Sequence, residues 1–187
     1  MKNYVNRLEK DGKVSYTMGV KYTNKNGEAK TGFIPVNFSS KIEAPAKTGL
    51  MQINSFMLGV AGEGKAKVII NNYVEATKDT KAPENAIARI WVNKNKFGTW
   101  QTSAKNEYNG KTTYANMPVT FRKGSEPEGE SALIAVKEAF FGGYDTKEGT
   151  YAPTLVIMDY EASKAKEAAE TATEEGASEA AEEEFPW

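Results

Sequence analysis

The chain has 187 residues and a formal charge of −1, and it contains neither cysteine nor histidine. Its length suits one domain that buries roughly 70% of its unfolded surface. The missing residue types exclude disulfides, thiolate metal sites and any catalytic mechanism that needs an imidazole. No paired-carboxylate motif takes their place, so we expect a protein that is not an enzyme and that binds no cofactor or metal.

Alternating apolar residues predict that most of the chain up to residue 160 is β-strand. In 14–23 every second residue is apolar or aromatic, and the turn sequence at 24–27 predicts a hairpin into a strand at 30–38. Phe33 lies on the side of that strand opposite its apolar face. The spacing of the strands is typical of a small barrel or sandwich, so we expect an all-β body. Further strands are expected at 50–60, 65–76, 85–93, 112–122 and 154–160.

One segment departs from the strand pattern. Within 131–141, Leu133, Val136, Lys137 and Phe140 fall at helical spacing, and two glycines follow that would end such an element. We therefore predict one short helix in this segment.

The segment 59–66 is close to the phosphate-binding loop of nucleotide hydrolases, with two glycines flanking four residues ahead of Lys65. That motif needs a serine or threonine hydroxyl for magnesium directly after the lysine, and it must open a helix. Here Ala66 follows, and the next residues form a strand pattern. The segment predicts a hairpin loop and no nucleotide site.

Three predicted strands, 65–76, 85–93 and 112–122, carry basic and aromatic side chains opposite their apolar faces, and the loop 93–100 adds more. Residues 1–123 hold 20 lysines and arginines against 9 acids, a net charge of +11. Rings that stack on bases, set in a basic groove, are what a sequence-tolerant binder of single-stranded nucleic acid needs. The candidate nucleic-acid-binding residues are Phe33, Lys65, Lys67, Tyr73, Arg89, Trp91, Lys94, Lys96, Phe97, Trp100, Tyr114, Arg122 and Lys123.

The same aromatic residues also have a purely structural interpretation. Tyr73, Trp91 and Tyr114 could equally be buried against a second element or a partner subunit, so burial and nucleic-acid binding explain them about equally well. The same two explanations apply to Trp100 and to the candidate phenylalanines, Phe33 and Phe97. Recognition of double-stranded DNA is less favoured, because the sequence contains no candidate recognition helix rich in Arg, Asn and Gln.

The end of the chain differs sharply from the rest in charge. Residues 161–187 hold 9 glutamates and 2 lysines, a net of −7, while 1–160 hold 22 basic and 16 acidic residues, a net of +6. No apolar residue larger than Ala occurs from 161 to 184, so we expect 161–187 to be a disordered acidic tail with a partner-binding tip. The tip residues are Glu182, Glu183, Glu184, Phe185, Pro186 and Trp187.

An all-β basic body followed by an acidic linker and a proline-aromatic end resembles the bacterial and phage single-stranded DNA-binding proteins, in particular the phage or mobile-element type. Those proteins end in acids, an apolar residue, proline and an aromatic, as residues 182–187 do. The resemblance implies an oligonucleotide-binding (OB) type of barrel over 1–160 that binds and protects single-stranded DNA in replication or recombination. It also implies that the tip binds replication or recombination proteins, and that the acidic stretch competes with DNA for the groove.

The resemblance leaves the homo-oligomeric state open, because the family includes tetramers, dimers and monomers. No apolar run approaches the ~18 residues that a membrane span needs, and the first residues lack the apolar stretch of a signal peptide. We therefore expect a cytoplasmic protein of a bacterial or phage-infected cell. Two alternatives remain, a structural or scaffolding protein of a virion and a barrel that binds single-stranded RNA.

Overall fold

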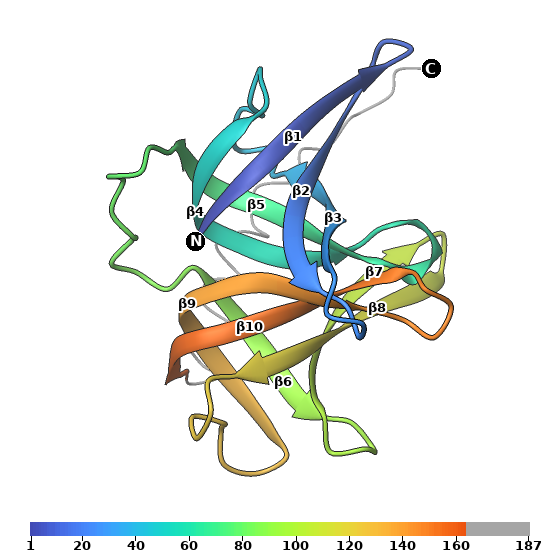
Figure 1. Ribbon diagram of the computed structural model, residues 1–187, viewed down its shortest axis with the longest axis vertical. Helices are drawn as coiled ribbons and strands as arrows, with labels where there is room; N and C mark the ends of the chain where they lie inside the picture. Colours follow the sequence, from blue (N-terminus) through green and yellow to red (C-terminus); the bar gives the residue numbers. More distant parts are fainter. Residues whose placement is uncertain (164–187) are drawn as a thin grey trace, which may run out of the picture.

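The computed structural model describes residues 1–163, and all the long elements in that part of the chain are β-strands (Figure 1). The all-β prediction is therefore confirmed. A single 3-10 turn, Gly62–Gly64, lies in the loop predicted at 59–66. Among the described residues no helix has the length and apolar character that a bilayer crossing requires. The strands are β1 (Lys2–Lys10), β2 (Lys13–Thr23), β3 (Ala29–Phe38), β4 (Gly49–Val60), β5 (Ala66–Glu75), β6 (Ala88–Lys94), β7 (Trp100–Tyr108), β8 (Lys111–Phe121), β9 (Ser131–Asp145) and β10 (Tyr151–Ala162).

The strands close into two five-stranded barrels with the same topology. The order around the first is β1-β2-β3-β5-β4, and around the second β6-β7-β8-β10-β9. In each barrel the third and fifth strands pair in parallel and the other pairs are antiparallel. This arrangement confirms the prediction of an OB-like small barrel. The region expected to form one barrel domain contains two of them.

The two barrels repeat each other in local detail. The pentapeptides at 34–38 and 117–121 read Ile-Pro-Val-Asn-Phe and Met-Pro-Val-Thr-Phe, and each ends the third strand of its barrel. Phe38 pairs with Ile70 in the first barrel as Phe121 pairs with Ile157 in the second. The β4–β5 and β9–β10 ladders each carry two register shifts directly after those pairs. The chain is therefore a tandem repeat of one barrel.

An aromatic cluster at the same place supports each barrel. In the first, the ring of Phe38 packs edge-on against Tyr16 at 4.9 Å and Tyr73 at 5.3 Å between centroids. Such aromatic pairs stabilise a fold by about 0.5–1.5 kcal/mol beyond their buried area. The equivalent cluster of the second barrel consists of Trp100, Phe121 and Tyr160, with centroid distances of 5.7 and 5.4 Å.

The prediction of a helix within 131–141 is wrong, because this segment belongs to β9. Four consecutive residues, 133–136, are buried, so apolar side chains occupy both faces of the strand. The strand pairs with β6 along one edge and β10 along the other. Burial on both faces removed the alternation that identifies a strand, and the remaining pattern matched helical spacing.

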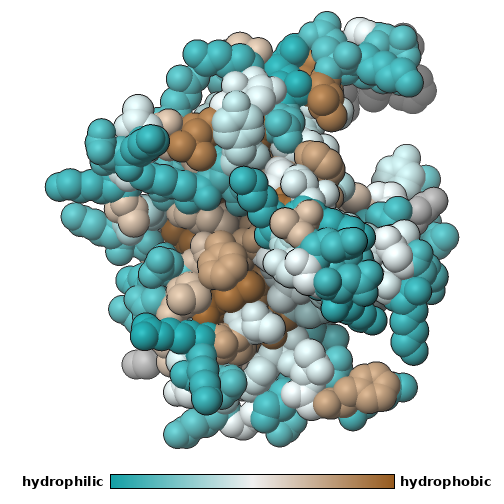
Figure 2. Space-filling model, viewed as in Figure 1, coloured by the Kyte–Doolittle hydropathy of each residue, from teal (hydrophilic) through white to brown (hydrophobic). Residues whose placement is uncertain are grey.

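The barrels pack against each other through equivalent elements. Strands β4 and β5 of the first barrel contact β7 and β8 of the second, and β9 and β10 of the second contact β2 and β3 of the first. Val60 of β4 forms a small buried cluster with Ala104 and Ala115 across this interface. The contact is therefore self-complementary, like that of a two-fold dimer. Figure 2 shows apolar side chains gathered near the middle of one face, with hydrophilic ones around them.

A tyrosine ring is wedged into the joint between the barrels. The Tyr151 ring lies directly over the backbone of Gly32 in β3, and a Cβ on that glycine would overlap the ring. Gly143 of β9 approaches the same ring equally closely. The Tyr151 hydroxyl donates a hydrogen bond of 2.9 Å to the carbonyl of Gly142. Two glycines thus make room for one ring that connects the barrels.

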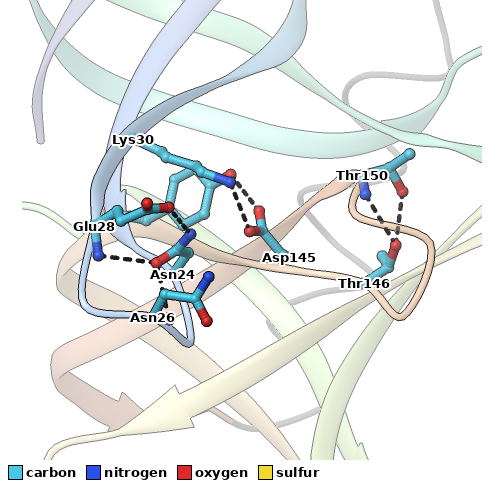
Figure 3. A network of polar contacts seen from close by, with 8 residues as sticks. Asn24, Asn26, Glu28, Lys30, Asp145, Thr146 and Thr150 are labelled. Atoms are coloured by element: carbon cyan, nitrogen blue, oxygen red, sulfur yellow. Dashed lines mark hydrogen bonds and ion pairs between the residues drawn. The ribbon is translucent and has the colours of Figure 1, made fainter.

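A polar cluster closes one side of this joint (Figure 3). The Tyr22 hydroxyl donates to Oδ1 of Asp145 at 2.6 Å, and Nζ of Lys30 lies 3.0 Å from Oδ2. Asp145 comes from the second barrel, and the other two residues come from the first. The Tyr22 hydrogen bond and then the Lys30 ammonium lower the pKa of Asp145, while the same hydrogen bond raises the pKa of Tyr22.

Candidate nucleic-acid interface

The outer side of β6, β7 and β8 brings several of the predicted residues together. Buried Val92, Ala104 and Met117 mark the inner side of these strands, so their sequence neighbours point outward. Cross-strand pairing places Lys105 beside Tyr114 on that outer side. We call this surface the second-barrel face. Its residues are Arg89, Trp91, Asn93, Gln101, Ser103, Lys105, Glu107, Tyr114, Asn116 and Thr120.

Two open rings and several polar groups characterise the second-barrel face. The side chains of Trp91 and Tyr114 are 58% and 59% exposed. Lys105 forms an ion pair of 3.0 Å with Glu107 at the edge of the face, and the Ser103 hydroxyl donates to Oδ1 of Asn116 at 2.6 Å. Rings that are exposed on a rigid sheet and flanked by hydrogen-bonding side chains can stack on unpaired bases.

A loop of the first barrel borders this face. Gly64 lies against β8, where a Cβ on the glycine would stand 3.2 Å from the carbonyl oxygen of Tyr114. Lys65, the next residue, is exposed at this border. Lys67 lies on β5, opposite Gly59 of β4, and so belongs to a different side of the first barrel. Each barrel therefore contributes to the surroundings of Tyr114.

Three predicted binding residues are engaged in packing or ion pairs and do not form open platforms. Trp100 is only 7% exposed and packs on Phe121 in the core. Tyr73 packs on Phe38, and its hydroxyl donates to the carbonyl of Glu43 at 3.0 Å. Nζ of Lys94 lies 5.1 Å from the Trp100 ring centroid and 3.3 Å from Glu130. Each faces the inner side of its strand, which apolar and aromatic patterns alone do not reveal. Their assignment to a nucleic-acid-binding surface stays a prediction.

The other predicted residues lie around the two barrels. Lys96 and Phe97 occupy the hairpin loop between β6 and β7, where Nζ of Lys96 stands 5.1 Å from the centroid of the 79% exposed Phe97 ring. Arg122 and Lys123 follow the end of β8 and are exposed. Phe33 lies on β3 of the first barrel and is 56% exposed. Arg89 and Trp91 of β6 and Tyr114 of β8 thus share the outer side of one sheet, with β7 between them, and the other candidate residues lie elsewhere.

The sequence-based prediction included only Phe33 from the equivalent surface of the first barrel. Its strand β1 was not predicted, because Val5 is its only fully buried residue and the alternation is weak. The repeated pentapeptide would have revealed this surface, since it aligns β3 with β8. We call this surface the first-barrel face. Its residues are Lys2, Tyr4, Asn6, Leu8, Lys10, Lys13, Ser15, Thr17, Gly19, Lys21, Thr31, Phe33 and Asn37.

The tail predicted at 161–187, with its tip at 182–187, lies outside the described residues from 164 onward. Among residues 1–163, no group of three or more Asp and Glu side chains could hold a metal ion.

Comparison with known proteins gave only weak structural similarity. No protein-family model matches the chain, and no curated protein matches it. A deletion mutant of the single-stranded DNA binding protein from Thermus aquaticus has a TM-score of 0.33 and 10% sequence identity, covering 87% of this chain and 94% of that one. A similarity this weak does not establish a shared function.

Proposed function

We propose that this protein is a non-enzymatic, sequence-tolerant binder of single-stranded DNA. The observation that carries the proposal is the second-barrel face, on which Trp91 of β6 and Tyr114 of β8 are exposed on the outer side of the sheet, with β7 between them. Lys105 of β7 pairs with Tyr114, and Arg89 shares the outer side of β6 with Trp91. In OB-type barrels, oligonucleotides bind on the outer side of the second and third strands, which here are β7 and β8. The Tyr114 ring on β8 therefore lies where stacking on bases is expected, and the Trp91 ring extends the same outer side onto β6, the first strand of the barrel.

Single strands fit this surface better than duplexes. Stacking requires bases that are not already stacked in a helix. Among residues 1–163 the only helical element is the 3-10 turn at Gly62–Gly64, so the described part of the chain offers no helix for a major groove. Stacking on bases also tolerates sequence, because every base has a flat ring face.

The tail extends this proposal to a role in replication or recombination, of the phage or mobile-element type. Residues 164–187 carry 2 lysines against 8 glutamates, a net of −6, beside a basic body. The acidic stretch competes with DNA for the basic faces, and Phe185, Pro186 and Trp187 bind replication or recombination proteins. The protein acts in the cytoplasm of a bacterial or phage-infected cell.

The proposal is tested with fluorescently labelled oligo(dT) and the full-length protein, by anisotropy at low salt. Replacing Trp91 by leucine keeps an apolar side chain but removes the flat ring, and loss of one stacked base costs about 1–3 kcal/mol. Binding should therefore weaken by roughly tenfold or more. Tyr108→Leu is the matched control, because Tyr108 is 73% exposed but lies on the opposite side of β7 from Lys105.

Two results would contradict the proposal. Oligo(dT) that does not bind at low salt, even to protein truncated after Ser163, excludes single-stranded DNA binding. Equal affinity of the Trp91→Leu and Tyr108→Leu variants excludes the second-barrel face as the site. Stronger binding of oligo(U) than of oligo(dT) would identify the protein as an RNA binder. A Trp91→Leu variant that loses self-assembly but keeps DNA binding would support a structural role.

A further inference from the structure

The first-barrel face repeats three positions of the second-barrel face. Val5 pairs with Gly49 as Val92 pairs with Ala132, which aligns β1 with β6. In the same way Lys21 pairs with Thr31 in the first barrel, and Lys105 pairs with Tyr114 in the second. The two faces therefore carry the same kind of residue at three equivalent positions: Tyr4 and Trp91, Asn6 and Asn93, and Lys21 and Lys105.

The first-barrel face has the open rings that stacking needs. Tyr4 is 52% exposed and Phe33 is 56% exposed. Phe33 pairs with Gly19 of β2, and a Cβ on that glycine would lie 3.8 Å from the phenylalanine ring. The ring therefore rests over the bare backbone of the neighbouring strand, with Asn6 beside it. It is held in place at the centre of the sheet and presents its other side to solvent.

The charge of the first-barrel face is entirely positive. Its outer positions carry Lys2, Lys10, Lys13 and Lys21, and none of its members is an acid. The single acidic residue of β1, β2 and β3 is Glu9, which points to the other side of its strand and forms an ion pair of 2.8 Å with Arg7. A positive surface without acids attracts a phosphate backbone and releases its counterions.

From these features we propose that the first-barrel face is a second binding site for single-stranded nucleic acid, so that one chain holds two segments of a strand. This proposal rests on the proposed function of the second-barrel face. The barrels are locked together by the Tyr151 ring and by the ion pair of Lys30 with Asp145, so the two sites keep a fixed separation. A strand long enough to reach both faces binds more tightly than a short one, because its second contact is intramolecular.

The number of short oligonucleotides bound per chain tests this proposal directly. An OB-type barrel binds about 4–16 nucleotides, so oligo(dT) of about eight residues fits one face. Native mass spectrometry of the full-length protein at low salt should show two such oligonucleotides per chain. The double variant Tyr4→Leu with Phe33→Leu should leave one site at wild-type affinity and weaken the other by about tenfold or more. Leucine keeps an apolar side chain over Gly19, so the fold is retained.

The outcomes separate this proposal from the function on which it rests. One short oligonucleotide per chain, with a Tyr4→Leu and Phe33→Leu variant that binds like wild type, overturns the second site and leaves the second-barrel face intact. No oligonucleotide bound to the wild type overturns the function itself. Oligo(dT) of about thirty residues should bind as one oligonucleotide per chain, and its affinity should fall when either face is altered. If only Trp91→Leu lowers that affinity, the second site is contradicted.

Discussion

Replacing Gly32 by alanine tests the joint between the two barrels. The added Cβ would overlap the ring of Tyr151, which enters from the other barrel. The ring cannot move away freely, because Gly143 supports it from its own barrel and its hydroxyl is held by the carbonyl of Gly142. The backbone of Gly32 itself accepts alanine, since its φ is not positive. Any destabilisation therefore comes from the contact between the barrels.

The expected size of the effect follows from the packing. Forcing one extra carbon into a filled contact costs about 1–3 kcal/mol. Replacing glycine by alanine also restricts the unfolded chain, which stabilises by about 0.4–1 kcal/mol where there is room. The net expectation is a loss of about 1–2 kcal/mol in the free energy of unfolding. Gly49→Ala is the matched control, because no atom lies within 4 Å of the position that its Cβ would take, and it should be neutral or slightly stabilising.

Urea denaturation followed by circular dichroism measures these changes. In a Tyr151→Ala background the ring is gone, so Gly32→Ala should cost almost nothing, and the double-mutant cycle should give a coupling close to the full effect. The reasoning is refuted if Gly32→Ala is as harmless as Gly49→Ala. It is equally refuted if its cost persists without the Tyr151 ring.

Three further predictions concern charge. Tyr22 and Lys30 hold the pKa of Asp145 below its ordinary value of 3.8, so this carboxylate stabilises the fold above that pH and the contribution is lost as the pH falls through the lowered pKa. Asp145→Asn should therefore lower the melting temperature at pH 7, and the difference from wild type should shrink below pH 4; a difference independent of pH would contradict this. Lys21→Gln should reduce the slope of log affinity against log salt by about 0.7 if the lysine meets one phosphate, while Lys81→Gln should leave it unchanged. Truncation after Ser163 should tighten oligo(dT) binding at low salt, and unchanged or weaker binding would argue against competition by the tail.

The strands that sequence patterns predicted well are those with one buried and one exposed face. In β3, Ile34 and Val36 are buried while Phe33 is exposed, as alternation predicts. In contrast, β1 was missed because it buries little, and β9 was taken for a helix because residues 133–136 are buried on both faces. Alternation therefore identifies a strand only where the two faces differ in environment.

The candidate site could be predicted in part for the same reason. Arg89 and Trp91 follow buried neighbours with clear alternation, so their outward direction was evident from the sequence. The direction of Trp100 was not evident, because it begins β7 next to a polar loop and its burial depends on Phe121. The first-barrel face depends on the hairpin of β1 with β2. Its local signal was the two-residue turn Asp11-Gly12, in which both residues have positive φ, and this turn fixes the register of the two strands.

Lysine footprinting with and without bound oligo(dT) tests the central claim most directly. Mass spectrometry after reductive methylation reports the protection of each lysine in the full-length protein. We predict that oligo(dT) protects Lys10, Lys13 and Lys21 of the first-barrel face and Lys105 of the second-barrel face, while Lys81, in the linker between β5 and β6, stays as reactive as in the free protein. Equal reactivity of the four face lysines with and without a saturating strand would contradict nucleic-acid binding at these faces.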